Sequence, residues 1–356
     1  MKRPIALFCS FALALGCASP SPAYESIRLG GEWFLNNQNE DFIYYNYDAK
    51  DDVHPDESHA MREMGALWSI YNLGDFLEDA RYEVLAERGL AYFKASIETD
   101  VENGFSYVNI TPGKVKLGYS GFMILNLLES NDPEKDALME SLAEGILFHQ
   151  SEEGELDTFF YSDRSTGVDY YPGEALLALM KLYHHSGEEA YLKAVEKALP
   201  FYRTYFEENP NTAFIPWQTQ AYYEYYQVQP SVEVADYIFG MNDYLIEQFS
   251  EDNCTDFKED AGVVMAVYVE GMNKAYMLAD ERGDTERKAC YARFIRAELE
   301  NVMALQFPME GQIEEEFGLS AVGGFFGSKN DLTMQVDRNQ HATMALMGAY
   351  LLGLAN

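Results

Sequence analysis

The chain of 356 residues is 47% hydrophobic and 14% aromatic, which is enough apolar material for one large core. Its 59 acidic residues, set against 25 lysines and arginines, give a formal net charge of −34. This charge excludes nucleic acid and anionic membrane surfaces as favourable partners, and it predicts an acidic, well-solvated exterior.

The N-terminal segment has the organisation of an export signal. Met1-Lys2-Arg3 is positive, residues 5–15 are apolar but too short to cross a bilayer, and Leu15-Gly16-Cys17 precedes a Ser/Pro-rich stretch. This order resembles a bacterial lipoprotein signal, cleaved before Cys17 and lipidated on its thiol. We therefore expect a signal peptide over 1–16, a tether over 17–23, and a lipid anchor to a membrane of the bacterial cell envelope. Ala14 stands where Leu is preferred, so ordinary secretion is the alternative.

Two kinds of helix alternate along the rest of the chain. Between residues 188 and 206, apolar positions recur at helical spacing among charged ones, which predicts an amphipathic outer helix. From 175 to 183 nearly every position is apolar, which predicts a helix buried all round. Outer helices are predicted over residues 24–37, 79–96, 133–150, 188–206, 231–249 and 284–307. Buried helices are predicted to begin near Ser58, Lys114, Gly173, Pro216, Ala261 and Arg338.

Short breaks such as Ser186-Gly187 join each buried helix to the outer helix that follows it, which makes helical hairpins. Six such hairpins predict an all-α fold, an (α/α)6 toroid in which six buried helices form a closed ring inside six outer ones. An open solenoid of helix pairs is the alternative. No linker divides the chain, so residues 24–356 are expected to form one domain. Alternation predicts short strands within 104–107 and 157–161, and the glycine-rich segment 318–327 is predicted to be a loop.

Cys254 and Cys290 are the cysteines beyond the N-terminal segment. Export would permit a disulfide between them. However, Cys254 precedes the buried helix near 262–277, and Cys290 lies early in the antiparallel helix that follows. A separation of about one helix length, roughly 30 Å, is then expected, which argues against a bridge.

The starts of the buried helices carry the candidate functional residues. All six buried helices run the same way in a toroid, so their N-terminal ends share one mouth. Glu174 opens one of them beside Tyr171, and Trp217 opens another. Acidic residues favour helix N-termini for electrostatic reasons alone, which is a sufficient explanation for any single one. It does not explain the aromatic side chains beside them, which suit the stacking of sugar rings, while paired carboxyl groups suit glycoside chemistry.

Glu270 is predicted to lie in the middle of a buried helix, where a carboxyl group needs a partner or a raised pKa. Asp337 and His341 are four residues apart and share a helix face, so Asp337 could orient His341. Structural pairing within the core is the alternative for each of them. Acidic clusters elsewhere lack the spacing of a calcium loop, so neither a metal nor another cofactor is expected.

A family resemblance rests on Tyr170-Tyr171-Pro172-Gly173-Glu174-Ala175, on Glu270-Gly271, and on Gly323-Gly324-Phe325 followed by Asp337-Arg338-Asn339-Gln340-His341. With the hairpin pattern, these phrases resemble the six-hairpin glycosidase superfamily, and within it uncharacterised bacterial lipoproteins. The resemblance covers nearly the whole chain beyond the N-terminal segment, at the level of the fold. It implies a glycan-active protein with a saccharide in its central bowl. No defined family's catalytic pair maps onto this chain.

Three functions are consistent with these observations. The first is a glycoside hydrolase or lyase that draws its acids from Glu174, Glu270 and Asp337. The second is a sugar epimerase or isomerase of the N-acylglucosamine 2-epimerase type, which would use His59 and His341. The third is a non-catalytic lipoprotein that binds a glycan or a partner. The residues proposed for catalysis are Glu174, Glu270, Asp337 and His341, and those proposed for substrate binding are Arg62, Tyr171, Trp217 and Gln340.

Cations at the same mouth bear on the charge of the substrate. Arg62, Lys114, Lys116 and Arg338 all fall at starts of buried helices in a chain with few basic residues. Together they would neutralise the carboxylate of an anionic saccharide. The alternative is local pairing with neighbours such as Glu63 and Asp337.

Overall fold

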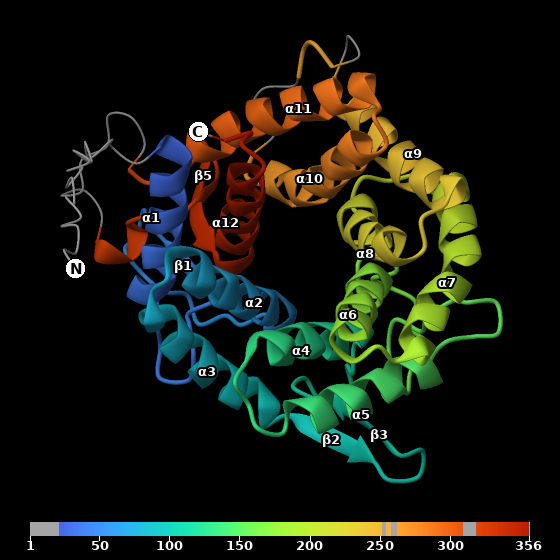
Figure 1. The fold of residues 1–356 in the computed structure, drawn as a ribbon. Coiled ribbons are helices and arrows are strands. Elements are labelled where there is room, and N and C mark those ends of the chain that lie inside the picture. Colours follow the sequence, from blue (N-terminus) through green and yellow to red (C-terminus); the bar gives the residue numbers. More distant parts are fainter. Residues whose placement is uncertain (1–20, 251–253, 258–261, 309–317, 356) are drawn as a thin grey trace, which may run out of the picture.

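The computed structural model describes residues 21–250, 254–257, 262–308 and 318–355. The signal segment and Cys17 lie outside these residues. In the described part, six inner helices surround the centre of a ring and six outer helices sheathe them (Figure 1). The inner helices are α2 (Ala60–Leu77), α4 (Leu117–Glu129), α6 (Tyr171–Ser186), α8 (Ile215–Val228), α10 (Met265–Glu281) and α12 (Val336–Leu351). The outer helices are α1 (Pro22–Asn36), α3 (Ala80–Lys94), α5 (Lys135–Phe148), α7 (Glu189–Glu208), α9 (Val232–Phe249) and α11 (Thr285–Met303).

The ring is closed. Each inner helix packs on the next one, and α12 packs on both α2 and α1, so the last hairpin meets the first. Asn339 of α12 fixes this seam by donating a hydrogen bond of 2.6 Å from Nδ2 to the carbonyl oxygen of Gly30 in α1. The predicted (α/α)6 toroid is confirmed, and the open solenoid is excluded.

The inner and outer helices differ in how they begin. Five outer helices start with a side-chain cap that accepts a hydrogen bond from a backbone N–H of the first turn. The caps are Ser21, Asp79, Glu188, Ser231 and Asp284. The inner helices have no side-chain cap hydrogen bond. The inner helices are therefore held by burial on all faces, and their first turns remain available to line a site.

Two small antiparallel sheets decorate the ring. The hairpin of β2 (Ile97–Asp100) and β3 (Phe105–Val108) confirms the strand predicted within 104–107. Residues 157–161 form only an isolated bridge between Phe159 and Lys116. The second sheet has the order β1-β5-β4, formed by β1 (Asn46–Asp48), β5 (Asp331–Gln335) and β4 (Phe326–Ser328).

The glycine-rich segment 318–327 is more ordered than the predicted loop. It contains a 3-10 turn, Leu319–Ala321, and the first residues of β4, and the side chain of Phe325 is fully buried. Gly323 has a φ of +83°, and a Cβ there would lie 1.8 Å from the carbonyl oxygen of Leu29. The glycine thus allows this segment to pack directly against α1.

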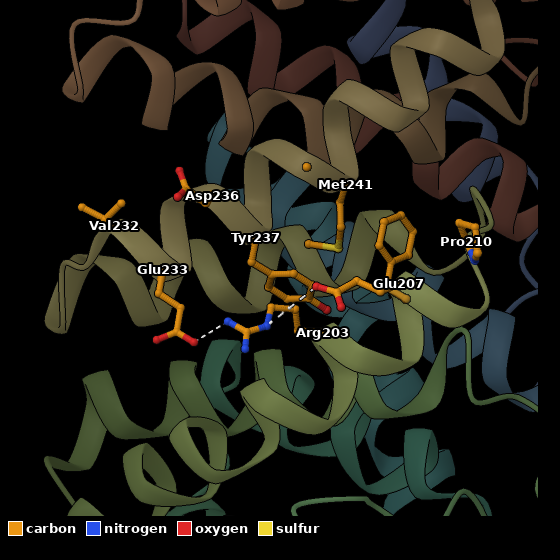
Figure 2. Close-up of a pocket in the computed structure, with 10 residues that line it drawn as sticks. Arg203, Glu207, Pro210, Val232, Glu233, Asp236, Tyr237 and Met241 are labelled. Atoms are coloured by element: carbon orange, nitrogen blue, oxygen red, sulfur yellow. Dashed lines mark hydrogen bonds and ion pairs between the residues drawn. The ribbon is translucent and has the colours of Figure 1, made fainter.

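A groove of 640 Å³ lies on the outside of the ring, between α7 and α9 (Figure 2). Tyr237 and Met241 line it, and Arg203 of α7 pairs across it with Glu233 of α9 and along its own helix with Glu207. The groove belongs to the outer sheath. None of the described helices combines the length and apolar character that a membrane-spanning helix requires.

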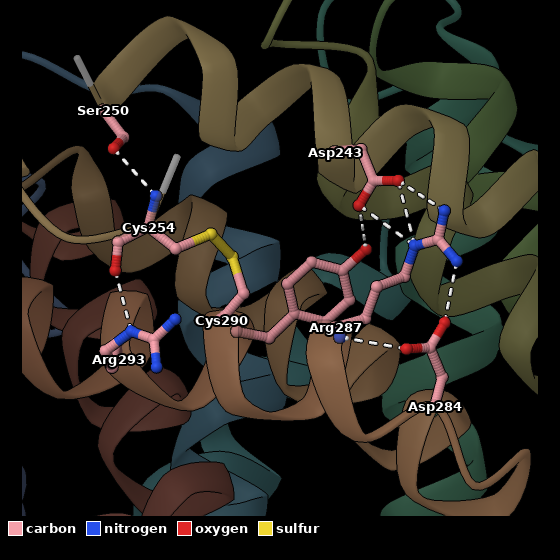
Figure 3. The surroundings of a disulfide bond; sticks show 8 residues. Asp243, Ser250, Cys254, Asp284, Arg287, Cys290 and Arg293 are labelled. Carbon is pink, nitrogen blue, oxygen red and sulfur yellow. Dashed lines mark hydrogen bonds and ion pairs between the residues drawn. A yellow bond between two sulfur atoms is a disulfide. The ribbon is translucent and has the colours of Figure 1, made fainter. Parts of the chain in front are cut away.

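The expectation against a disulfide is wrong, because Cys254 and Cys290 are bonded with their Cα atoms 5.2 Å apart (Figure 3). Asp243 of α9 pairs with Arg287 in the first turn of α11 and accepts a hydrogen bond from Tyr291. The later part of α9 therefore lies against the start of α11. Cys254, in the loop after α9, is thereby brought beside Cys290, so the expected separation of about one helix length does not arise.

Candidate functional site

A cavity of 310 Å³ opens at the N-terminal ends of the inner helices. We call it the front cavity. It is lined by His59, Met61, Arg62, Phe122, Tyr170, Tyr171, Glu174, Ala213, Trp217, Val264, Val267, Tyr268, Asp337, Gln340 and His341. Every inner helix or the residue just before it contributes to this lining. Seven of the eight residues proposed from the sequence for catalysis or binding line the cavity, and the eighth, Glu270, is bonded to His341.

Glu174 is buried in the first turn of α6, with only 4% of its surface exposed. Its Oε2 has no hydrogen-bond partner. A Cβ added to Gly118 would lie only 2.2 Å from this oxygen, so the glycine leaves room for the carboxyl group. Burial raises the pKa of Glu174 to about 8, and the charge of Lys116 only partly opposes this. Glu174 is therefore a carboxylic acid rather than a carboxylate at neutral pH.

Lys116, the residue before α4, is the nearest cation to Glu174. Its ammonium group lies over the rings of Tyr119 and Tyr171, at 5.3 and 5.5 Å from their centroids. Burial lowers the pKa of Lys116, while the charge of Glu174 opposes that shift. The two groups thus tune each other without forming an ion pair.

Glu270 and His341 form a buried pair between α10 and α12. His341 Nδ1 and Glu270 Oε1 are 2.7 Å apart. Burial raises the pKa of Glu270 against the opposing effect of His341. Burial alone would lower the pKa of His341, but the charge and hydrogen bond of Glu270, together with the charge of Asp337, outweigh it, so the net direction is upward. Because Nδ1 is occupied, Nε2 is the imidazole nitrogen left for a ligand in the front cavity.

Asp337 is held by Arg62 rather than by His341. The Arg62 Nε lies 3.3 Å from Asp337 Oδ2, while Asp337 Oδ1 is buried without a partner. Arg62 also donates to the hydroxyl of Tyr45. Asp337 is thereby fixed at the start of α12. Because α6 and α12 are three places apart in the ring of six, Asp337 and Glu174 lie on opposite walls.

Aromatic side chains and one amide complete the cavity. Trp217 packs edge-on against Phe122 and His341, with ring centroids 5.5 and 6.2 Å apart. Gln340 is 2% exposed, and its Nε2 has no partner. It occupies the space left by Gly65, where a Cβ would lie 2.6 Å from Oε1. The cavity therefore offers flat apolar walls together with unpaired polar groups.

Tyr268 is a lining residue that the sequence analysis missed. It lies in the first turn of α10, and its hydroxyl is 3.0 Å from the hydroxyl of Thr212. Its position in the first turn of a buried helix was the available signal. Gly118 is a second omission, since a glycine within an apolar helix often marks a close approach.

Of the four cations expected to cluster, only Arg62 lines the front cavity. Arg338 points to the β-sheet, where it pairs with Asp331 at 2.8 Å, and Lys114 is exposed outside the cavity. Arg62 is engaged by Asp337. Glu63 also lies outside the front cavity, where it accepts a hydrogen bond from the backbone N–H of His59 at the start of its own helix. Local pairing therefore accounts for two of the four cations, Arg62 and Arg338.

Among the described residues, no three histidine, cysteine or acidic side chains are grouped so that they could hold a metal ion. The absence of a metal or other cofactor stays a prediction.

Comparison of the structure with solved structures identifies the same fold in sugar-active enzymes. An α-1,6-mannanase of family 76 from a Salegentibacter species matches with a TM-score of 0.68 and 12% identity, covering 93% of this chain and 99% of the mannanase. A family 76 glycoside hydrolase from a bovine Bacteroides thetaiotaomicron strain matches with a TM-score of 0.69 and 11% identity, covering 94% and 78%. A D-mannose isomerase matches with a TM-score of 0.67 and 11% identity, covering 91% and 96%.

No protein-family model matches the sequence, and no curated protein matches it either. The structural similarity at 11–12% identity defines the fold. This chain therefore has the (α/α)6 toroid fold of these enzymes, and the front cavity is its candidate functional site. What the cavity does must be argued from its own residues.

Proposed function

We propose that this protein is a glycan-active enzyme, and that it hydrolyses a glycosidic bond in the front cavity. The observation that carries the proposal is the carboxyl group of Glu174, which is buried in an aromatic cavity opposite Asp337 and whose pKa this burial raises to about 8. A carboxylic acid with a raised pKa and a second carboxyl group across the substrate are the two groups that glycoside hydrolysis requires. The fold shared with family 76 mannanases supports a saccharide as the substrate.

In this mechanism, Glu174 donates its proton to the oxygen of the leaving sugar. Asp337, held by Arg62, acts on the opposite face of the ring, either by activating water or by direct attack. Trp217 and Tyr171 supply faces on which sugar rings stack, and Gln340 offers an unpaired amide to a hydroxyl group. The anomeric configuration of the first product, measured by NMR, distinguishes the two actions of Asp337.

The proposed pair differs from that of the mannanases. One mannanase variant in the comparison is inactive after the replacement of two adjacent aspartates. In this chain the only adjacent aspartates are Asp51 and Asp52, which are exposed and outside the front cavity. Glu174 and Asp337 are therefore proposed to act in their place.

The test is the release of reducing sugar from a panel of oligosaccharides that includes α-1,6-mannotriose. Replacing Glu174 by Gln or Asp337 by Asn should lower kcat by about 10²–10⁴-fold. Glu298→Gln is the matched control, because Glu298 is a fully buried glutamate of α11 with a pKa raised to about 7, outside the cavity. Full turnover by both cavity variants would contradict the assignment.

A second function, sugar isomerisation, is favoured by the His341–Glu270 pair. An imidazole that is oriented by a carboxylate can move a proton between neighbouring carbons of an open-chain sugar. His59 on the adjacent helix α2 also lines the cavity, and its Nδ1 is unpaired. Incubation of aldoses and ketoses in D2O distinguishes this function: His341→Gln would abolish deuterium uptake, whereas Glu174→Gln would preserve it. Saccharide binding without any turnover would instead favour a binding lipoprotein.

We also propose that the protein is exported and anchored through a lipid on Cys17, in the cell envelope. The supporting observations are the N-terminal sequence pattern and the Cys254–Cys290 disulfide, since disulfides persist in oxidising compartments. Mass spectrometry of the mature N-terminus should find a diacylglyceryl-modified Cys17. An unmodified N-terminus between residues 16 and 24 would refute the anchor.

A further inference from the structure

A second, larger cavity opens at the other end of the ring. Its volume is 660 Å³, within the range of about 300–1,000 Å³ typical of small-molecule sites. We call it the rear cavity. Its lining, from the later turns of inner helices and from Tyr24 of α1, is Tyr24, Trp68, Asn72, Asp75, Phe76, Leu177, Lys181, Gln220, Glu224, Glu270, Asn273, Lys274, Met344, Met347, Gly348, Tyr350 and Leu351.

The two cavities lie back to back. Trp68 lines the rear cavity and Trp217 the front one, and their ring centroids are 6.4 Å apart. Glu270 of the rear lining is bonded to His341 of the front lining. These two pairs contribute to the partition between the cavities, so a ligand in the rear cavity would occupy a separate site.

Buried polar groups in the rear cavity lack partners. Gln220 is 6% exposed and Asn273 is 5% exposed, yet Gln220 Nε2 and Asn273 Oδ1 have no hydrogen bond. Leaving such a group unpaired costs about 1–3 kcal/mol, so each needs an explanation. One of these atoms is a donor and the other an acceptor. A hydroxyl-rich ligand satisfies both, because each hydroxyl can donate and accept.

In the rear cavity two ammonium groups face one carboxylate, while of the other acidic lining residues Glu270 is already paired and Asp75 is exposed. Lys181 and Lys274 both approach Glu224 Oε1, at 2.9 and 3.3 Å, so two ammonium groups share one carboxylate. Each ammonium group has three donors and can serve a second acceptor. Neither lysine lies in the last turn of its helix, so the favourable field of a helix C-terminus does not explain the pair.

Aromatic side chains form part of the rear wall. Tyr24, Phe76 and Tyr350 contact one another with ring centroids 5.6–6.0 Å apart, and Trp68 lies in the same lining. Aromatic faces beside amides and charged groups are the composition that recognises sugar rings, apolar on their faces and polar at their edges.

We propose that the rear cavity is a second saccharide-binding site, which prefers a sugar that carries a carboxylate. The aromatic side chains stack on the ring, Gln220 and Asn273 bind hydroxyl groups, and Lys181 and Lys274 bind the carboxylate. The inference does not rest on the hydrolysis proposed for the front cavity.

The test is isothermal titration of the folded Glu174→Gln protein, which prevents turnover, with α-1,6-mannotriose and with a trigalacturonate. Trigalacturonate should bind the rear cavity more tightly than the neutral trisaccharide. Gln220→Leu and Lys274→Met should each weaken this binding at least tenfold. Lys288→Met is the matched control, because Lys288 lies on α11 in an exposed ion pair with Asp280. It should leave the affinity unchanged.

The variants also keep the two proposals separable. Gln220→Leu removes an unpaired amide, so the variant should fold at least as stably as its parent, which a thermal melt checks. Two binding events, of which one responds to the rear variants, support both cavities as saccharide sites. A single event that responds to them supports the rear site and contradicts the front one. If no binding of either probe responds to Gln220→Leu or Lys274→Met, the rear site is refuted.

Discussion

Glu174 shows how one buried side chain acquires its chemistry from its neighbours. Gly118 leaves room for its carboxyl group, and burial removes the water that would stabilise the charge. The charge of Lys116 only partly offsets this loss. A carboxyl group in this position avoids the free-energy cost of a buried charge by remaining protonated. The same environment makes Glu174 a proton donor at neutral pH.

Stability should depend on pH through Glu174. Its pKa rises from the ordinary value of 4.5 to about 8 on folding, so the folded state binds more protons between these values. The stability contribution of the protonated form is therefore complete below about 4.5 and is lost as the pH rises through 8, with a slope approaching about 1.4 kcal/mol per pH unit. Relative to Glu174→Gln, the parent protein should become progressively less stable over this window, as measured by urea unfolding. A pH-independent difference would contradict the raised pKa.

Catalysis should respond to the same ionisation. If Glu174 is the acid, kcat/KM falls above a pH of about 8, where its proton is lost. The Glu298→Gln control should keep this limb, although Glu298 also has a raised pKa, because it lies outside the cavity. A basic limb that stays in place when Glu174 is replaced by Gln would assign it to another group.

The Glu270–His341 pair gives a second prediction at this scale. Glu270→Gln removes the negative charge that holds the proton on His341, while the burial of His341 remains. The pKa of His341 should then fall, which NMR titration of the imidazole measures. Gln has nearly the same shape as Glu, so the variant changes the charge beside His341 without changing the packing. An unchanged His341 titration would show that the pair is not coupled.

At the scale of elements, the outer helices are fixed locally and the inner helices are fixed by packing. Capping residues such as Ser231 and Asp284 precede helices whose observed starts differ from prediction by one residue. The inner helices lack such caps, so α10 begins at Met265 rather than near 261. The positions where the inner helices begin and end are set by packing against neighbouring helices of the ring.

The disulfide ties the loop after α9 to the second turn of α11 across 36 residues of chain. Replacing both Cys254 and Cys290 by Ser should lower the free energy of unfolding by about 2–4 kcal/mol, because the unfolded chain gains freedom. Chemical denaturation under oxidising conditions measures this loss. Under reducing conditions the parent protein and the variant should be nearly equal, and a gap that persists there would indicate another cause.

At the scale of the whole molecule, the seam between the first and last hairpins closes the ring. A Cβ on Gly30 would lie 2.6 Å from Thr343 Cγ2, and Thr343 is fixed by the hydrogen bond from its hydroxyl to the carbonyl oxygen of Asn339. Gly30→Ala should therefore destabilise the toroid by about 1–3 kcal/mol, as measured by denaturant unfolding.

Gly240→Ala is the control for the seam. Gly240 lies in the outer helix α9 with no atom within 4 Å of the added Cβ, so the change should stabilise the protein by up to about 1 kcal/mol. Stability changes of opposite sign for the two variants would show that close packing, rather than helix propensity, requires glycine at position 30. A stabilising Gly30→Ala would contradict the tight seam.

The sequence by itself determined the helices, their alternation and their count, because helical periodicity and punctuation by Gly and Pro are local properties. It also placed Glu174, Trp217 and Asp337 at one mouth, since the toroid follows from the repeat. Tertiary structure decided which charges meet. Arg62 pairs with Asp337 and Arg338 with Asp331, while Glu270 bonds His341 across 71 positions of sequence. The contact of α9 with α11, and the disulfide that accompanies it, depend on how the helices pack. Side-chain direction and helix tilt are set by neighbours distant in sequence, so no local pattern encodes them.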